Sequence, residues 1–491
     1  MLCRSTIFPS AVSLFLFSVL VEPAVARAQN DSAEVAQLRD QVRQLTGLVV
    51  TLESRVDALE RREGVERAVE HALPEGTARL EHAVAELRGP RSVGGASADG
   101  DAILAGAQAP AAPVPAVLPG GATLNYYFDG YFENNFNNPT GRVNDLRAYD
   151  VLSRVFSINQ ADLVYDLDPD VQAGRRYGAR LDLQFGQATE TLQGNPANEP
   201  RPEIYRNIFQ AYGTYVVPVG KGLNVDLGKW ASSLGIEGNY AKDQMNYTRS
   251  FFFYFLPFYH LGARVHYGFN DKLGVNYWIV NGTNQSEPTN GYKDEMFGLA
   301  LQPAKSLSWT VNYYLGQEHP DAAMASNCTV PVQPGLCFVP ITPAPNGKLH
   351  IFDNYLTWTA TPKLTLAAEG DYVIQRLWTN AAPGESAAPM TNYGGAAYAQ
   401  YQFSPKYSLA ARTEYLADPD GTFSNASQDL KEITGTWRYN VADNLALFLE
   451  YRRDWSNRDY FVTDNPAAPV NHQDTAGAGV VWWYGGKQGA W

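Results

Sequence analysis

The chain has 491 residues, of which 45% are hydrophobic, 12% aromatic and 18% charged, and its net charge is −13 at pH 7. The acidic balance argues against a partner nucleic acid and against docking on anionic lipid through a basic patch. The mean hydropathy of −0.29 argues against a helical membrane protein. In agreement with this, no stretch after the first thirty residues has 18 consecutive apolar residues.

Residues 1–28 are predicted to be a signal peptide. Arg4 supplies a positive charge, Ala11–Val21 form a short apolar segment, and Ala26-Arg27-Ala28 matches an A-x-A cleavage site. The apolar segment is too short to span a bilayer as a helix. The alternative is an uncleaved anchor. The sequence therefore predicts export.

Residues 31–88 are predicted to form a periplasmic helical segment that begins with a coiled coil. Valine recurs every seven residues and leucine follows three residues later, without a miss over four heptads. The alternative is a single amphipathic helix on another surface. The predicted core residues are Val35, Leu38, Val42, Leu45, Val49, Leu52, Val56 and Leu59.

Residues 89–121 are rich in Ala, Gly, Pro and Ser and are predicted to be a linker. From residue 122 to 491 the apolar pattern changes to a period of two. In Tyr177–Gly186 the apolar side chains alternate with Arg180, Asp182 and Gln184, and Asn444–Asp454 behaves in the same way. One apolar face and one charged face indicate a membrane barrel around a wet interior, although a soluble sandwich has the same periodicity.

The connections favour the barrel over the sandwich. Strands are predicted in pairs that are joined by very short turns, and longer loops join one pair to the next. Aromatic residues, such as Trp309, Trp358 and Trp437, lie beside the short turns, as in the girdles of such barrels. The predicted fold is all-β, a transmembrane antiparallel up-and-down barrel of about 16 strands preceded by the coiled coil.

Several segments resemble the OmpL-like β-barrel porin family of the bacterial outer membrane. They include Asp129-Gly130-Tyr131-Phe132-Glu133, Leu146-Arg147-Ala148-Tyr149-Asp150, Pro257-Phe258-Tyr259-His260 and Glu450-Tyr451-Arg452-Arg453-Asp454, in this order within residues 123–491. The resemblance implies an outer-membrane channel for the passive diffusion of small hydrophilic solutes and ions, and a homotrimer. The Val/Leu core of the coiled coil alone favours a dimer.

The strand alternation places a set of charged residues on the predicted inner face, where charges set the selectivity of a channel. Both signs occur, and the alternative is that these residues only form ion pairs between strands. The predicted pore-lining residues are Arg180, Asp182, Arg206, Asp226, Arg264, His266, Glu369, Asp371, Arg412, Glu414, Glu432, Arg438, Glu450, Arg452 and Asp454.

The third long loop, residues 233–257, is the candidate for narrowing the channel. It carries Glu237, Lys242, Asp243 and Arg249 together with several aromatic residues. Its charges would set the ion preference and its aromatic side chains could stack on sugars. The alternative is an extracellular flap.

Cys328 and Cys337 lie in a proline-rich loop and are predicted to form a disulfide in an oxidising compartment, with free thiols as the alternative. Their spacing does not suit a metal site. We expect no cofactor and no metal, because no metal-binding or nucleotide-binding motif is present. We expect no enzyme, because the seven histidines fall in no defensible nucleophile–base pattern.

The sequence thus predicts an outer-membrane porin whose coiled coil lies in the periplasm, with membrane lipid and small hydrophilic solutes as its partners. The alternative is a barrel that serves as an anchor, while its coiled coil tethers the membrane to periplasmic or cell-wall partners.

Overall fold

The computed structural model describes residues 116–118, 120–193, 202–320, 322–324, 338–340, 347–376 and 388–485. The predicted signal peptide, the coiled coil with its core residues, most of the linker, Cys328 and Cys337 lie outside the described residues. Within the described part of the chain, no helix is long and apolar enough to cross a membrane.

The described residues are almost all in strands. The elements are β1 (Ala116–Val117), β2 (Thr123–Asn135), η2 (Thr140–Arg142), β3 (Ser157–Leu167), β4 (Tyr177–Phe185), α3 (Ala188–Gln193), α4 (Pro202–Tyr205), β5 (Ile208–Val217), β6 (Leu223–Ala231), η3 (Ala241–Asp243), α5 (Phe251–Phe255), β7 (Tyr259–Asn270), β8 (Leu273–Val280), β9 (Asp294–Ala304), β10 (Leu307–Gly316), β11 (Ala322–Met324), β12 (Phe338–Pro340), β13 (Leu349–Thr361), β14 (Leu364–Arg376), β15 (Pro389–Ser404), β16 (Tyr407–Asp418), β17 (Gln428–Ala442), β18 (Leu445–Ser456) and β19 (His472–Tyr484).

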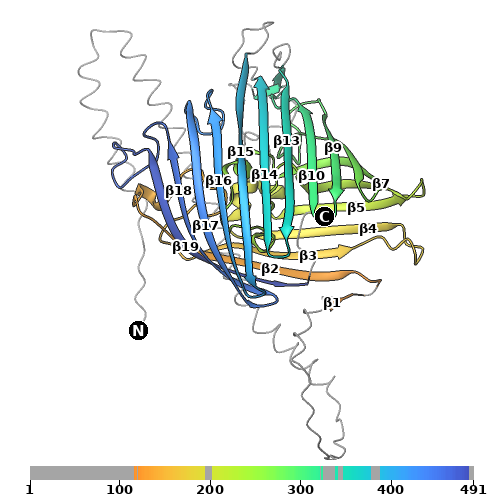
Figure 1. The fold of residues 1–491 in the computed structure, drawn as a ribbon. Coiled ribbons are helices and arrows are strands. Elements are labelled where there is room, and N and C mark those ends of the chain that lie inside the picture. The colour runs from red at the N-terminus through yellow and green to blue at the C-terminus, as the bar shows by residue number, and fades with distance from the viewer. Residues whose placement is uncertain are drawn as a thin grey trace, which may run out of the picture. The chain divides into compact units, whose positions relative to one another are not determined.

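Sixteen long strands close into one antiparallel barrel. Each strand from β2 to β19 pairs with the next long strand, and β19 returns to pair with β2 along Thr475–Tyr484. Figure 1 shows this closure, where the orange β2 lies beside the blue β19. The two-residue β1 adds to β2, and β11 pairs with β12 in a separate small sheet. The predicted sixteen-strand up-and-down barrel is confirmed.

Residues of alternating character lie on opposite faces of the barrel wall. On β4, Leu181 is 39% exposed and its neighbour Asp182 is fully buried; on β18, Tyr451 is 47% exposed and its neighbour Arg452 is fully buried. Since the outer surface of the wall is uncovered in a single chain, a buried charged side chain that alternates with exposed apolar ones faces the interior. The wall therefore has an apolar outer face and a polar inner face.

The two rims of the barrel differ. Five hairpins turn over two residues each, at 271–272, 305–306, 362–363, 405–406 and 443–444. The exposed aromatic side chains Phe269, Trp309, Trp358, Phe403 and Tyr407 lie beside these short turns. The opposite rim carries the long connections, which include 136–156, 232–258 and 457–471. Short turns and an aromatic belt on one rim, with long loops on the other, are typical of bacterial outer-membrane barrels.

The outer face gives a test of this assignment. Leu449 lies in the apolar band of β18, between Leu447 and Tyr451. Leu449→Arg is expected to lower the free energy of unfolding by roughly 2–4 kcal/mol, because a cation in mid-membrane loses its hydration. Val441→Arg, at the short-turn rim, should cost no more than about 1 kcal/mol. Urea titration of the barrel in lipid vesicles measures both, and equal losses would contradict the assigned membrane position.

Candidate functional site

The site centres on residues 232–258, which connect β6 to β7 and are called loop 3. The loop closes at its base, where the Ser232 amide donates to the Phe258 carbonyl at 2.9 Å. It contains η3 and α5. Ser250 caps α5, because its hydroxyl oxygen accepts the Phe253 amide at 2.9 Å. Pro257, which has no amide hydrogen, lies one residue beyond the C-cap of the helix, Leu256, and prevents its continuation.

One side of loop 3 is bonded to the wall formed by β2, β3 and β4. The Ala241 amide donates to the Tyr127 hydroxyl at 2.9 Å, and the Tyr247 hydroxyl donates to Asp129 at 2.5 Å. The side chain of Gln160 donates to Asn239 at 2.7 Å. Tyr240 donates to Asp182. Burial raises the pKa of the Tyr240 and Tyr247 hydroxyls, which therefore stay neutral donors.

The other side of loop 3 is bonded to β16, β17 and β18. Arg412 donates to Glu237 and to the Thr248 carbonyl, both at 2.7 Å. The Tyr247 and Thr248 amides donate to the two oxygens of Glu450 at 2.7 and 3.0 Å. The loop therefore contacts strands on both sides of the point where β19 and β2 meet, in addition to β6 and β7. Loop 3 lies inside the barrel rather than outside it as a flap.

A chain of ion pairs continues from loop 3 along the inner wall. Arg412 pairs with Glu432 at 2.6 Å, and Arg452 pairs with Asp454 at 2.7 Å. Arg147, on the connection between β2 and β3, pairs with Asp454 at 2.9 Å. Burial alone would lower the pKa of the Arg147 guanidinium, but its acidic neighbours, Asp454 first, outweigh burial and raise it. All of these side chains are buried, so each charge depends on its partners.

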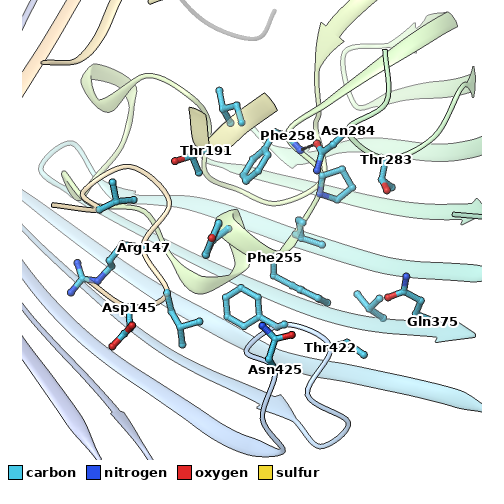
Figure 2. Close-up of a pocket in the computed structure, with 18 of the residues that line it drawn as sticks. Asp145, Arg147, Thr191, Phe255, Phe258, Thr283, Asn284, Gln375, Thr422 and Asn425 are labelled. Carbon is cyan, nitrogen blue, oxygen red and sulfur yellow. Dashed lines mark hydrogen bonds between the residues drawn. The ribbon is translucent and has the colours of Figure 1, made fainter. Parts of the chain in front are cut away.

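Two cavities border loop 3. The larger is about 660 Å³ and is lined by residues of loop 3, of the connections 136–156, 419–427 and 457–471, and of β13 and β14. Figure 2 shows Arg147 and Asp145 on one side of it, and Asn284, Thr283 and Gln375 on the other, with Phe255 between them. The smaller cavity is about 280 Å³ and is lined by residues 231–240 and by Tyr149, Phe209 and Phe258. Both mix apolar and polar side chains.

Fourteen of the fifteen predicted pore-lining residues lie on strands, and in each the strand alternation directs the side chain toward the interior. Arg206 is the exception. It lies between α4 and β5, and its guanidinium is 3.5 Å from the Glu203 carboxylate on α4. The sequence pattern predicts a strand over residues 204–217, but β5 begins only at Ile208, because α4 occupies residues 202–205. That these residues line a conducting pore remains a prediction.

Many of the predicted pore residues pair with one another. Asp226 accepts from Arg264 at 2.7 Å, and Arg180 lies 3.4 Å from Asp182. His266 shares a hydrogen bond with Asn276 at 2.8 Å. The four candidates on loop 3 divide into two kinds. Glu237 is buried at the inner wall, where it meets Arg412, and Arg249 is buried within the loop, where it donates to the Asn239 carbonyl. Lys242 and Asp243 pair with each other at 2.7 Å.

Sequence reasoning missed several charged residues of the interior. Asp129 and Glu133 lie on β2, where aromatic residues occupy both faces and hide the alternation. Asp162 lies on β3, for which the sequence pattern predicts a strand over residues 153–166, whereas β3 begins four residues later, at Ser157. Asp353 lies on β13, where Ile351 and Tyr355 share the inner face with it. Arg147 lies on a connection, where no periodicity exists. Although the aromatic residues obscure it, Asp129, Glu133 and Asn135 share one face of β2, and this spacing of polar residues was a signal that could have identified part of the set.

The comparison with known protein families agrees with the fold. Residues 121–482 match the family described as "Putative beta-barrel porin-2, OmpL-like". No curated protein sequence matches the chain. Solved structures with a similar fold include the outer membrane channel DcaP of Acinetobacter baumannii, with 11% identity, 78% of this chain and 100% of that chain covered, and a TM-score of 0.48. An anion-selective porin from Comamonas acidovorans has 9% identity over 74% of this chain and 99% of that chain, with a TM-score of 0.44.

Proposed function

Because the chain belongs to the OmpL-like β-barrel porin-2 family, we propose that it forms a water-filled channel for the passive diffusion of small hydrophilic solutes and ions across the outer membrane. The observation that carries the proposal is a sixteen-strand barrel with a charged inner wall and a loop that lies inside it. A barrel of this size has room for an aqueous passage. Loop 3 would narrow that passage and decide which solutes enter it.

We infer a preference for cations from the balance of charge on the inner wall. Among the described residues, fourteen buried acidic residues lie on the inner face of strands, against four buried basic ones. Fixed negative charge along a narrow passage attracts cations and repels anions. The acidic residues are Asp129, Glu133, Asp162, Asp166, Asp182, Asp294, Asp353, Glu369, Asp371, Glu414, Asp418, Glu432, Glu450 and Asp454; the basic residues are Arg180, Arg264, Arg412 and Arg452.

Single-channel recording in a planar bilayer tests the proposal. With a KCl gradient, stepwise currents should reverse at a potential whose sign shows that K⁺ crosses faster than Cl⁻. Asp162→Asn should move the reversal potential toward zero, since it removes a buried interior charge. Asp474→Asn, which lies on the outer face beside Arg453, should leave it unchanged. A reversal potential of the opposite sign would contradict the cation preference.

The same recording separates the channel from its alternative, an anchor. The bonds of loop 3 to opposite sides of the wall are compatible with both a channel and an anchor. A barrel that serves only as an anchor, however, should pass no current when it is correctly folded. Absence of current from a folded barrel would overturn the channel and leave the tether as the better account.

We also propose, from the sequence alone, that the protein is not an enzyme, that the coiled coil lies in the periplasm, and that the chain forms homotrimers.

Shortening the chain to begin at Gly121 tests the coiled coil. If the coiled coil drives assembly, the shortened barrel should fold but form oligomers less readily in size-exclusion chromatography. Unchanged oligomers would contradict that role. Currents in groups of three from the full chain would support the trimer.

A further inference from the structure

Three carboxylates converge on the inner wall beside residues 233–236, which are called the first arm of loop 3. Asp353 lies on β13, and Glu369 and Asp371 lie on β14. Each offers one oxygen, and these oxygens all lie within 4.8 Å of one another. The three residues are 1%, 7% and 6% exposed. Asp353 and Asp371 are directly opposite each other in the strand register, where like charges destabilise a sheet.

Two of the three carboxylates are held by donors. Asp353 accepts the Asn312 side chain at 2.7 Å and the Gly235 amide at 3.0 Å. Glu369 accepts the Ile236 amide at 3.1 Å and the Tyr398 hydroxyl at 3.2 Å. All four bonds are donated to the carboxylate oxygens, and donation from amide and hydroxyl groups favours the ionised form of an acid.

Asp371 is different, because both of its oxygens are buried and neither accepts a bond from an amide, a hydroxyl or a basic side chain; the group that it meets is the carboxylate of Asp353. A buried carboxylate without partners is costly, and here it lies opposite a second carboxylate. None of the ion pairs of the described residues includes Asp353, Glu369 or Asp371. An additional positive charge between the three acids would remove both the repulsion and the missing partner.

We propose that Asp353, Glu369 and Asp371 bind one divalent cation of the calcium class, and that this ion fixes the first arm of loop 3 to the barrel wall. Oxygens that share a calcium ion lie about 2.3–2.6 Å from it, so oxygens up to about 4.8 Å apart can do so. Carboxylates are the ligands that calcium prefers, and its irregular coordination tolerates the bonds that Asp353 and Glu369 already accept. Magnesium, which demands a tighter octahedron, should bind more weakly.

The ion would act on loop 3 through the wall residues that hold it. Besides Gly235 and Ile236, the carbonyl of Ser233 accepts from Asn312 at 3.1 Å and from Tyr355 at 3.2 Å. Residues 233–236 are therefore bonded to β10, β13 and β14 around the acidic cluster. Without the ion, repulsion between the acids should loosen this arm of loop 3 and the side of the 280 Å³ cavity that it forms.

Calorimetry on the full chain in detergent tests the proposal without any dependence on channel activity. Protein stripped with EDTA and dialysed should bind one Ca²⁺ per chain, with Mg²⁺ weaker. Asp371→Asn, which keeps the shape of the side chain and removes its charge, should weaken Ca²⁺ binding by at least about 10-fold, since the loss of even a residue that supports a metal ligand typically costs about 10-fold to 100-fold. Asp162→Asn is the matched control, because Asp162 is also buried with two unpartnered oxygens but lies on β3, outside the cluster. It should bind Ca²⁺ like the wild type.

Thermal unfolding gives a second test, because Ca²⁺ and EDTA should affect the unfolding temperatures of the wild type and of Asp371→Asn differently. Ca²⁺ should raise the unfolding temperature of the wild type and leave that of Asp371→Asn unchanged. In EDTA, Asp371→Asn should unfold at a higher temperature than the wild type, because one of the repelling charges is gone. No Ca²⁺ binding by the wild type, or equal binding by Asp371→Asn and the wild type, would overturn the proposal and show that the three acids share protons instead.

Discussion

Arg412→Ala is expected to lower the free energy of unfolding by roughly 3–5 kcal/mol, the cost of breaking a buried ion pair from one side. Arg412 is 1% exposed, and its guanidinium is within 3.3 Å of the carboxylates of Glu237, Glu414 and Glu432. Removing it would leave three buried acids without their shared cation. Urea titration of folding in lipid vesicles at neutral pH measures the loss.

Arg453→Ala is the matched control for this prediction. Arg453 also pairs with an acid of the neighbouring strand, Asp474, at 3.1 Å, but its side chain is 43% exposed on the outer face. A surface pair of this kind contributes no more than about 1 kcal/mol, so the loss should be small. If both variants lost the same free energy, Arg412 would not be the centre of a buried network.

Arg412→Ala should also release part of loop 3. Arg412 donates to Glu237 and to the Thr248 carbonyl, which lie on either side of residues 238–247 of loop 3. Both bonds vanish in the variant, whereas the bonds of the loop to β2, β3 and β4 remain. Limited proteolysis between Gly238 and Arg249 should therefore be faster than in the wild type, and an unchanged rate would contradict this role of Arg412.

The barrel wall was predictable because its physics is local. A strand with Leu445, Leu447, Leu449 and Tyr451 on one face and Glu450, Arg452 and Asp454 on the other has one arrangement in a membrane, and β18 adopts it. Two-residue turns with few apolar residues, such as Asp271-Lys272, mark where strands reverse. The two strand starts that were four residues early, at β3 and β5, follow a long connection and a short helix, where alternation stops.

The interior was less predictable, because its contacts join residues far apart in the chain. Glu237 and Arg412 are separated by 175 positions, and Arg147 and Asp454 by 307. Strand parity gave the inward direction of Arg412 and Asp454, but no local pattern identifies a partner that lies on a loop. The acidic cluster shows the same limit. Asp371 and Glu369 were predicted to face inward, yet their convergence with Asp353 depends on the register of β13 against β14.

The second large effect is expected from shortening loop 3. Glu237 accepts the Ser250 amide at 2.6 Å, so residues 238–249 form a sub-loop whose two ends lie close together. Replacing Gly238–Arg249 by two glycines should keep Glu237 bonded to Arg412 and the Phe251 amide bonded to Glu414. It removes the part of the loop that reaches Tyr127, Asp129 and Asp182 across the interior.

The shortened protein should conduct at least about twice as much current per channel, because the part of loop 3 that crosses the interior is gone. The sixteen-strand wall should persist, since none of its hydrogen-bond ladders involves the sub-loop. Excision of Asp464–Ala467, at the exposed tip of the connection between β18 and β19, is the control and should leave conductance unchanged. If conductance were unchanged in both, loop 3 would not narrow the passage, and solute entry would have to be controlled by the residues around the 660 Å³ cavity at the loop rim.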